Sequence, residues 1–177
     1  MTPEEFCATL QERFADAVER VDLKGRHPHA VIRAEAWHEV ARFLCDDPDL
    51  RINFLRSITG LDLLAENKLA AVYDLMDMCS DPAGGMWKSN HQFAIRIEVD
   101  RDNPHIPSVV DVWPAADWHE REAFDLFGIV FDGHPDLRRI LCPEDWEGFP
   151  LRKDYEFPLE YHGIPATTEF GLPSPKH

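Results

Sequence analysis

The chain has 177 residues and a mass of 20.4 kDa, and 44% of its residues are hydrophobic, enough to bury the core of one domain. Its formal net charge of −15 argues against nucleic acid as a partner, because phosphate binding needs a concentrated basic surface. No run of about 18 apolar residues occurs, which excludes a membrane-spanning helix, and the charged N-terminus predicts no secretory signal.

Two helices with a short strand between them are expected first. Apolar residues at helical spacing predict an amphipathic helix of about 16 residues that begins at Pro3. Its apolar face is expected to hold Phe6, Leu10, Phe14, Ala17 and Val21. A strand is expected over His29–Arg33, and a second helix over Ala34–Cys45. The apolar stripe of that helix is formed by Trp37, Val40, Ala41 and Leu44.

Three strands are expected next. The apolar run Ile52–Leu63 predicts one, with Gly60 as a possible bulge or bend, and Leu69–Met78 predicts a buried one. A turn is expected over Asp81–Gly85, and His91–Val99 alternates as a strand buried on one face does. We therefore expect an α+β fold, a two-layer sandwich of N-terminal helices on a mainly antiparallel sheet.

The chain changes character after this sheet. Ser108–Val112 predicts a last short strand, followed by a helix that ends at Gly128. Two starts are open for this helix. Pro114 suits the first helical position, and Asp117 with Glu120 suits a capping box.

An extended C-terminal arm is expected over residues 142–177, after an α+β domain over residues 1–141. Six of the fourteen prolines lie in the last 36 residues, a density that forbids long helices and central strands. Six large aromatic residues are interspersed there: Trp146, Phe149, Tyr155, Phe157, Tyr161 and Phe170. These are too many for an ordinary solvated tail, so we expect the arm to dock on a partner protein, with wrapping of its own domain as the alternative.

The sequence contains no motif of a known reaction centre. It lacks a P-loop, a dinucleotide fingerprint, a zinc-binding HExxH and a nucleophile elbow. The cysteines at positions 7, 45, 79 and 142 match no cluster or zinc pattern, and we interpret them as reduced thiols with a packing role. We accordingly expect no catalytic, cofactor-binding or metal-binding residue in this chain.

One stretch of the predicted last helix interleaves charges with large apolar residues. Asp117, Arg121 and Asp125 lie four residues apart, so two acids flank one arginine on a single stripe, and Glu122 lies beside apolar neighbours. Partly buried acids around an arginine suit an interface better than a reaction centre, whereas the alternative is an exposed salt-bridged helix. A basic patch then follows in an otherwise acidic chain, formed by Arg138, Arg139, Arg152 and Lys153.

Four blocks of this region resemble the signature of the 30-kilodalton subunit of respiratory complex I, which is also called its C subunit. The blocks are Glu120–Glu122, Asp125–Gly128, His134–Ile140 and Gly148–Asp154. The resemblance extends over Ser108–Tyr155, and its blocks have the right order and spacing.

The resemblance implies a non-catalytic structural and assembly subunit in the peripheral arm of a proton-translocating NADH:quinone oxidoreductase. Such a protein binds the D subunit, which helps to shape the quinone site, and cluster-bearing neighbours, and it has no autonomous active site. NADH, flavin, iron–sulfur clusters and quinone are then held elsewhere in the complex. The chain would lie at the cytoplasmic face of the inner membrane, attached only through its partners.

The residues that we expect at the partner interface come from the signature and the start of the arm. They are Glu120, Arg121, Glu122, Asp125, His134, Arg138, Arg139, Trp146, Arg152, Lys153 and Tyr155. Two other interpretations stay open. The same signature occurs in scaffold subunits of energy-converting hydrogenases and of ferredoxin- or F420-linked dehydrogenases. A small hydrolase that uses Glu120, Glu122 and His134 is the third interpretation, which the lack of a nucleophile or metal set disfavours.

Overall fold

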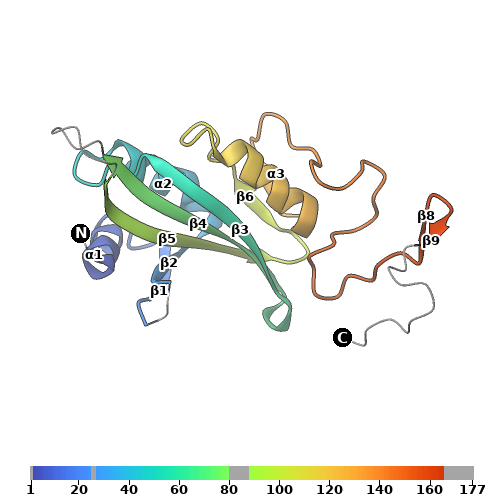
Figure 1. The fold of residues 1–177 in the computed structure, drawn as a ribbon. Helices are drawn as coiled ribbons and strands as arrows, with labels where there is room; N and C mark the ends of the chain where they lie inside the picture. The colour runs from blue at the N-terminus through green and yellow to red at the C-terminus, as the bar shows by residue number, and fades with distance from the viewer. Residues whose placement is uncertain (1, 25–26, 80–87, 166–177) are drawn as a thin grey trace.

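The computed structural model describes residues 2–24, 27–79 and 88–165. A five-stranded sheet in the order β1-β2-β5-β4-β3 forms the body (Figure 1). Its strands are β1 (Val18–Asp22), β2 (His29–Ile32), β3 (Phe54–Leu63), β4 (Lys68–Cys79) and β5 (Lys88–Asp100). The helices are α1 (Pro3–Arg13), α2 (Trp37–Asp46) and α3 (Ala116–Phe127), with single 3-10 turns at η1 (Ala34–Ala36) and η2 (Leu64–Glu66).

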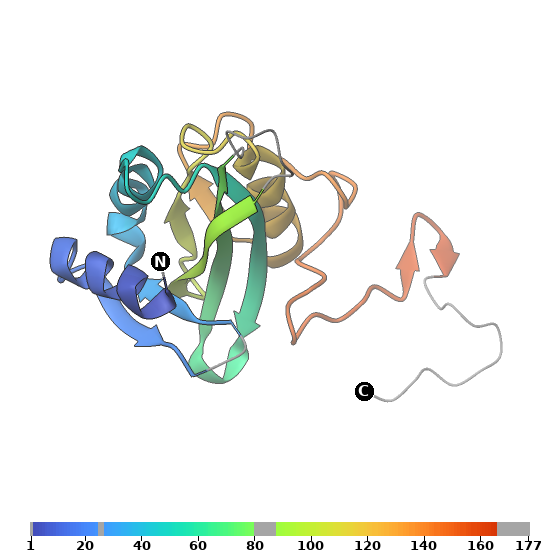
Figure 2. The same ribbon diagram turned by 60° about the vertical axis from the view of Figure 1, so that its left-hand side comes forward.

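All three helices cover the same face of this sheet. Side chains alternate between the faces of a strand, and the strand registers place Phe93, Tyr73 and Gly60 on one of them. The ring of Phe6 in α1 lies 4.3 Å from that of Phe93, and Trp37 in α2 lies 4.5 Å from Tyr73. Phe127 in α3 packs over Gly60. The two views in Figures 1 and 2 show the same layering, which confirms the expected α+β fold.

The sheet is antiparallel except where β2 runs parallel to β5. The apolar stripe of α2 and the inward residues of β5 are buried as the periodicity predicted. Both patterns are local, so they identify the buried face without knowledge of the partner element.

The first helix is shorter than predicted. It ends at Arg13, and Phe14 caps it by donating its N–H to the carbonyl oxygen of Leu10. Ala17 and Val21 therefore lie outside the helix, and Val21 belongs to β1, where it pairs with Ala30. The β-branched valines of this segment favour the extended pairing with β2 over continuation of the helix.

Gly60 is not a bulge. It pairs regularly with Ala71, and the irregularity of β3 lies between Leu55 and Ser57. A Cβ atom at Gly60 would lie 2.4 Å from Cδ2 of Phe127, so the missing side chain is what lets α3 lie close to the strand. The turn predicted over Asp81–Gly85 lies outside the described residues.

The strand predicted over Ser108–Val112 was wrong. The N–H groups of Val112 and Trp113 both donate to the carbonyl oxygen of Val109, which makes this segment a turn. The nearby strand is β6 (His105–Pro107), which pairs in parallel with β7 (Val130–Asp132) beyond α3. Ser108 still donates its N–H to the carbonyl oxygen of Asp132 in β7, and α3 then holds the turn through Glu120.

Neither predicted start of α3 is used. The helix begins at Ala116 with Ala115 as its N-cap, and no side chain caps it. The carboxylate of Glu120 cannot reach back to the helix start because it accepts hydrogen bonds from Ser108 and Val109. Gly128 ends the helix as predicted, with the left-handed backbone (φ 75°) that glycine adopts easily.

Beyond β7 the chain passes back over the end of α3 and then extends away from the body, and its described part ends in the small hairpin of β8 (Glu160–Tyr161) and β9 (Ile164–Pro165) (Figures 1 and 2). The division into a domain over residues 1–141 and an arm over residues 142–177 stays a prediction. Hydrogen bonds to the body continue as far as Lys153 and Asp154. Phe170 lies outside the described residues.

Candidate partner interface

The C-terminal end of α3 is completed by the chain that follows it. The last four carbonyl oxygens of a helix have no partner inside the helix. Here each finds one: Gly128 N–H donates to Phe124 O (2.9 Å), Arg139 Nη1 to Asp125 O (2.8 Å), Leu151 N–H to Leu126 O (3.1 Å) and Arg152 Nε to Phe127 O (2.8 Å). Two of the four donors are guanidinium groups, whose positive charge also suits the negative end of the helix dipole.

Asp125 binds the loop that turns back over α3. Its buried carboxylate accepts the N–H groups of Ile140, Leu141 and Cys142 at 2.6–2.9 Å and Nη1 of Arg139 at 2.7 Å. Burial by itself raises the pKa of this carboxyl, but the four donors outweigh it and hold the pKa at about 2. Asp125 is therefore ionised and acts as the anchor of this loop.

Arg139 joins three separate stretches of chain. Besides the carboxylate and carbonyl oxygens of Asp125, its guanidinium donates to the carbonyl oxygens of Trp146 (3.2 Å) and Gly148 (2.8 Å). Its five-donor fork suits this role, which a single ammonium group could not fill. Arg139 thus fixes the base of the arm to the helix.

Phe149 lies at the centre of this junction. The guanidinium carbons of Arg139 and Arg152 lie 5.4 Å and 4.7 Å from the centre of its ring. A Cβ atom at Gly128 would lie 2.5 Å from the same ring. Gly128 therefore serves twice, by ending the helix and by leaving room for the aromatic ring.

A buried arginine ties the arm to the far end of the sheet. Arg101 donates to the buried carboxylate of Asp62 at 3.1 Å and forms a two-pronged ion pair with Asp154. The N–H of Lys153 donates to the same Asp62 oxygen at 2.7 Å. Arg101 and Asp62 were not predicted from the sequence, because a lone Arg in a turn and a lone Asp in a strand carry no local signal.

Glu120 is buried on α3, where it faces the turn that precedes the helix. Its carboxylate accepts hydrogen bonds from the hydroxyl of Ser108 at 2.6 Å and from the N–H of Val109 at 2.8 Å. Burial raises the pKa of this carboxyl to about 7, although both hydrogen bonds act in the opposite direction. Glu120 therefore holds the turn before α3 in place, and it is not available at the surface.

Arg121 and His134 are also directed inward. Arg121 lies 4.0 Å from Asp117 and 4.0 Å from Asp136, not beside Asp125 as the predicted stripe had it. Nε2 of His134 lies 3.2 Å from the carbonyl oxygen of Asp117, and its Nδ1 accepts the N–H of Asp136 at 3.0 Å. The side chain of His134 is fully buried, so it closes the turn after β7.

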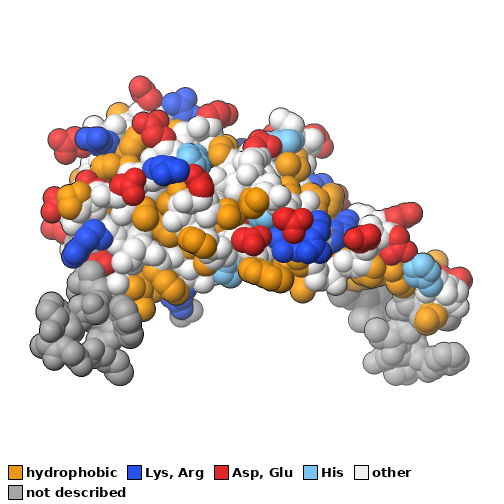
Figure 3. All heavy atoms as spheres, turned by 90° about the horizontal axis from the view of Figure 1, so that it is seen from above, with side chains coloured by type: hydrophobic (Ala, Val, Ile, Leu, Met, Phe, Trp, Pro, Cys, Tyr) orange, Lys and Arg blue, Asp and Glu red, His pale blue; other side chains and the backbone are white. Residues whose placement is uncertain are grey.

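Of the eleven residues expected at an interface, the three most exposed side chains belong to Glu122, Arg138 and Lys153. Trp146 and Tyr155 are half-buried at the arm's base, where the Tyr155 hydroxyl donates to the carbonyl oxygen of Glu147 at 3.1 Å. Seen from above, Lys and Arg side chains gather beside acidic ones where the body narrows into the arm, and hydrophobic side chains continue along it (Figure 3).

The exposed large hydrophobic residues gather in the same region. Eight are exposed among the described residues, and five of them follow α3: Leu141, Leu151, Phe157, Leu159 and Ile164. A sixth, Trp118, lies on the outer side of α3 over Arg121. The leucines and Ile164 were not singled out in the sequence, because apolar residues in an extended segment have no periodicity to show whether they are buried.

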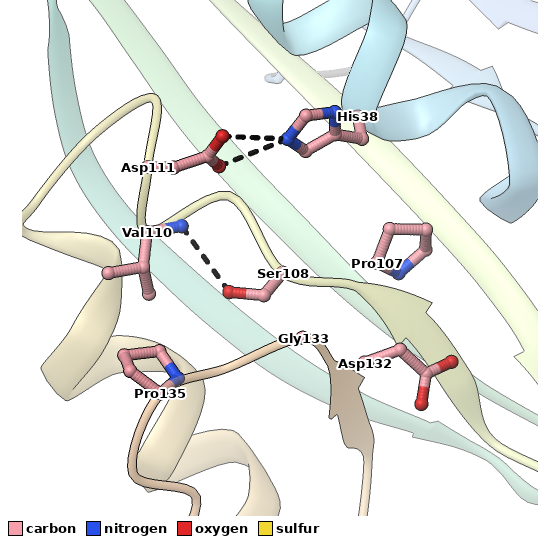
Figure 4. A pocket seen from close by; sticks show the side chains of 8 residues that line it. All are labelled: His38, Pro107, Ser108, Val110, Asp111, Asp132, Gly133 and Pro135. Carbon is pink, nitrogen blue, oxygen red and sulfur yellow. Dashed lines mark hydrogen bonds and ion pairs between the residues drawn. The ribbon is translucent and has the colours of Figure 1, made fainter.

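An open pocket of about 570 Å³ lies beside the turn before α3 (Figure 4). His38 Nε2 faces both carboxylate oxygens of Asp111, at 3.0 and 3.1 Å, whereas Ser108 is bonded to Glu120 and to the N–H of Val110. Within the part of the chain that the structure describes, no hydrogen bond links Ser108 to His38. The arrangement therefore lacks the coupled nucleophile and base that covalent catalysis needs.

The residues named for the hydrolase interpretation do not come together either. Glu120 faces Ser108, His134 faces Asp117, and Glu122 is exposed. Over residues 2–24, 27–79 and 88–165, no three His, Cys, Asp or Glu side chains are grouped so that they could hold a metal ion. No helix within these ranges is long and apolar enough to cross a membrane.

Comparison with known proteins identifies relatives of this chain. Residues 30–161 match the profile of the family described as the respiratory-chain NADH dehydrogenase 30 Kd subunit. The C subunit of NADH-quinone oxidoreductase from Chlorobium phaeobacteroides is 45% identical over 156 residues, which are 88% of this chain and 89% of that protein. The C subunit of the same enzyme from Chloroherpeton thalassium is 40% identical over 156 residues, 88% of this chain and 61% of that longer protein.

Two solved structures share the fold. A trypsin-resistant fragment of Nqo5 superposes with a TM-score of 0.58 at 32% identity, covering 77% of this chain and all (100%) of the fragment. A chain of the membrane-bound sulfane sulfur reductase, an archaeal respiratory membrane complex, gives a TM-score of 0.64 at 22% identity, covering 86% of this chain and 85% of that one. The second likeness shows the fold alone.

Proposed function

This chain belongs to the family of the respiratory-chain NADH dehydrogenase 30 kDa subunit, and we propose that it is a non-catalytic structural subunit of a proton-translocating NADH:quinone oxidoreductase. In this role it supports electron transfer from NADH to quinone by holding other subunits of the peripheral arm together. The D subunit and cluster-bearing subunits are the proposed partners. NADH, flavin, iron–sulfur clusters and quinone are bound by those neighbours.

One observation carries the proposal: the exposed apolar side chains lie on an extended segment whose base is fixed to the body. Phe157, Leu159 and Ile164 are 67%, 84% and 68% exposed. Such a group of large apolar side chains on a protruding segment is typical of a surface that a partner covers. The internal bonds of Asp125 and Arg139 fix the base of this segment to α3, which lowers the entropy cost of docking.

Most residues of the signature therefore make their contacts within this chain. Its buried acids and arginines build the junction between α3 and the arm, and its exposed members, Glu122, Arg138 and Lys153, lie around that junction. We propose that these three residues and the apolar arm together form the partner interface. Through this interface the complex would hold the chain at the cytoplasmic face of the inner membrane.

A scaffold role in a different redox complex is the second candidate. It is favoured by the fold shared with a chain of the membrane-bound sulfane sulfur reductase. An energy-converting hydrogenase or a ferredoxin- or F420-linked dehydrogenase would use the chain in the same structural way. Co-purification distinguishes the two: flavin- and NADH-binding subunits support the first candidate, and nickel-hydrogenase subunits support the second.

The proposal is tested by removing two apolar arm side chains in the cell. Phe157→Ser/Leu159→Ser should greatly reduce the amount of peripheral arm that assembles and the NADH:quinone activity of the membranes, while the purified chain keeps its melting temperature. Leu64→Ser on the body, where Leu64 is 41% exposed, is the matched control and should assemble normally. Full assembly without any copy of the chain, or NADH oxidation by the purified chain alone, would contradict the proposal.

A further inference from the structure

We propose that the tip of the arm recognises a partner surface that combines apolar side chains with Lys or Arg side chains at its rim. The inference rests on the proposed function and specifies the chemistry of the surface on which the arm docks. The tip comprises the hairpin of β8 and β9 and residues 156–159 before it. It contacts the start of the arm through the bonds of Tyr161 and His162 to Asp145.

The tip is acidic as well as apolar. Four carboxylates line an open pocket of about 420 Å³ together with Tyr155, Tyr161 and His162. The four are Asp145, Glu147, Glu156 and Glu160. No Lys or Arg occurs between Lys153 and the end of the described arm at residue 165. The two tyrosine rings give this pocket aromatic walls.

Among the described residues, three of these carboxylates have no partner of opposite charge. The carboxylate of Asp145 accepts a hydrogen bond from the Tyr161 hydroxyl at 2.8 Å and lies 2.7 Å from Nε2 of His162. The bond from Tyr161 has the larger effect, and together the two lower the pKa of Asp145. In the described part of the chain, no cation lies within ion-pair distance of Glu147, Glu156 or Glu160. The pocket therefore has unbalanced negative charge beside exposed apolar side chains.

The acids flank the apolar residues that the docked state must cover. Glu156, Phe157, Leu159 and Glu160 follow one another along the chain around Pro158, and Ile164 pairs with Tyr161 across the hairpin. A partner that covers Phe157 and Leu159 removes water from the neighbouring carboxylates as well. Removing water from a carboxylate without supplying a cation is unfavourable, so the partner surface must bring positive charge.

A basic side chain also fits the shape and chemistry of the pocket. An ammonium or guanidinium group is attracted both to carboxylates and to aromatic faces, and Tyr155 and Tyr161 supply the latter. The charge argues against two other occupants. A second copy of this chain has a net charge of −15, and an anionic lipid surface is negative too, so each would repel the tip.

The test compares charge removal with apolar removal in the assembled complex. We would replace the native copy with Glu147→Gln/Glu156→Gln/Glu160→Gln and measure the fraction of chain retained on the purified complex at about 0.05 M and about 0.5 M salt. Retention of the unaltered chain should fall with salt. The triple variant should bind about 10-fold more weakly at low salt and lose most of the salt dependence. Glu12→Gln/Glu66→Gln, which neutralises two exposed acids of the body, should behave like the unaltered chain.

The outcomes separate this inference from the proposed function. One outcome is that Phe157→Ser/Leu159→Ser is lost from the complex while the triple Gln variant is retained with unchanged salt dependence. The partner surface then has no basic rim, but docking through the arm is still supported. If both variants are retained, docking through the arm is wrong as well. A carbodiimide that joins carboxylates to lysines in direct contact gives a second measure. It should link Glu156 or Glu160 to a lysine of another subunit, and links to lysines of this chain alone would overturn the inference.

Discussion

Arg139 binds Asp125 twice, through the carboxylate at 2.7 Å and through the backbone carbonyl oxygen at 2.8 Å. The first contact pairs two charges on segments that are fourteen residues apart in sequence. The second completes the hydrogen bonding of the last turn of α3. Because Arg139 also donates to the carbonyl oxygens of Trp146 and Gly148, one side chain links the helix, the returning loop and the start of the arm.

Asp125→Asn should therefore release the loop from the helix. The three loop N–H groups all donate to Oδ2, so the amide oxygen of Asn can take over those bonds only as a weaker, uncharged acceptor. Its NH2 group then faces Nη1 of Arg139, donor against donor, and leaves the guanidinium without its charged partner. Breaking one side of a buried ion pair costs about 3–5 kcal/mol, so we expect a clearly lower free energy of unfolding and faster proteolysis between residues 139 and 155. Glu122→Gln, an exposed change on the same helix, should leave both unchanged. Equal proteolysis of the two variants would contradict the anchoring role.

The same carboxylate should contribute to acid sensitivity. Its pKa is held at about 2 in the folded chain, below the ordinary value of 3.8, so the folded state binds this proton less tightly than the unfolded state. The contribution of Asp125 to stability is complete above about pH 4 and is lost as the pH falls through about 2. The difference in unfolding free energy between the unaltered chain and Asp125→Asn should therefore shrink below pH 4 in denaturant titrations. A difference that is constant down to pH 2 would argue against an ionised Asp125.

Glu120 should act in the opposite direction. Burial, the largest influence, raises its pKa from 4.5 to about 7, so the folded chain binds this proton more tightly than the unfolded chain. Its contribution to stability is complete below about pH 4.5 and is lost as the pH rises to about 7. Gln can still accept the N–H of Val109 and donate to the hydroxyl oxygen of Ser108. Relative to the unaltered chain, Glu120→Gln should therefore gain about 2 kcal/mol between pH 5 and pH 8.

Thermal unfolding at a series of pH values measures this effect. Glu122→Gln is the matched control for removal of a carboxyl, because Glu122 lies two residues away on the same helix and is exposed. If the difference for Glu120→Gln is flat from pH 5 to pH 8, the carboxyl has an ordinary pKa and the proposed burial effect is absent.

Two glycines with similar backbone conformations allow steric contact to be separated from backbone strain. Gly128 and Gly133 have φ angles of 75° and 84°, so alanine is strained at both positions, by about 1 kcal/mol. A Cβ atom at Gly128 would lie 2.5 Å from the ring of Phe149, whereas at Gly133 no atom lies within 4 Å. Gly128→Ala should therefore cost about 1–3 kcal/mol more than Gly133→Ala in unfolding free energy. Equal losses would show that the Phe149 ring moves aside freely.

The parts of the fold that the sequence predicted are those with a local pattern. Trp37 and Val40 fall at helical spacing on α2, and Phe93 and Ile95 alternate along β5, so neighbouring residues alone identify the buried face. The turn at Ser108 was misread as a strand, because its conformation depends on Glu120, twelve residues later in the chain. An acid buried by a distant segment looks the same in sequence as a solvated one.

The same reason explains the division of the predicted interface residues. Asp117, Arg121 and Asp125 do share a helical spacing, but Asp125 pairs with Arg139, and Arg121 is near Asp136. Spacing limits which residues can meet within one helix, and it does not show which partner a returning loop will bring. Arg101 is the extreme case, because its partners Asp62 and Asp154 lie 39 and 53 residues away.

Arg138 and Arg139 are neighbours in the basic patch, but reversing the charge of each should have a different effect. The side chain of Arg138 is 63% exposed and, within the described part of the chain, pairs only with the exposed Asp136. That of Arg139 is 15% exposed and donates to four acceptors. Arg138→Glu should change the free energy of unfolding by less than about 0.5 kcal/mol and weaken association with the partner subunits, because an interfacial charge is inverted. Arg139→Glu places a second carboxylate beside Asp125 and should cost about 3 kcal/mol or more of folding stability.

Melting temperature and co-purification, measured on the same two variants, check both expectations. A stable Arg139→Glu that fails to associate would place the Arg139 side chain at the interface, and an unstable Arg138→Glu would place Arg138 in the fold.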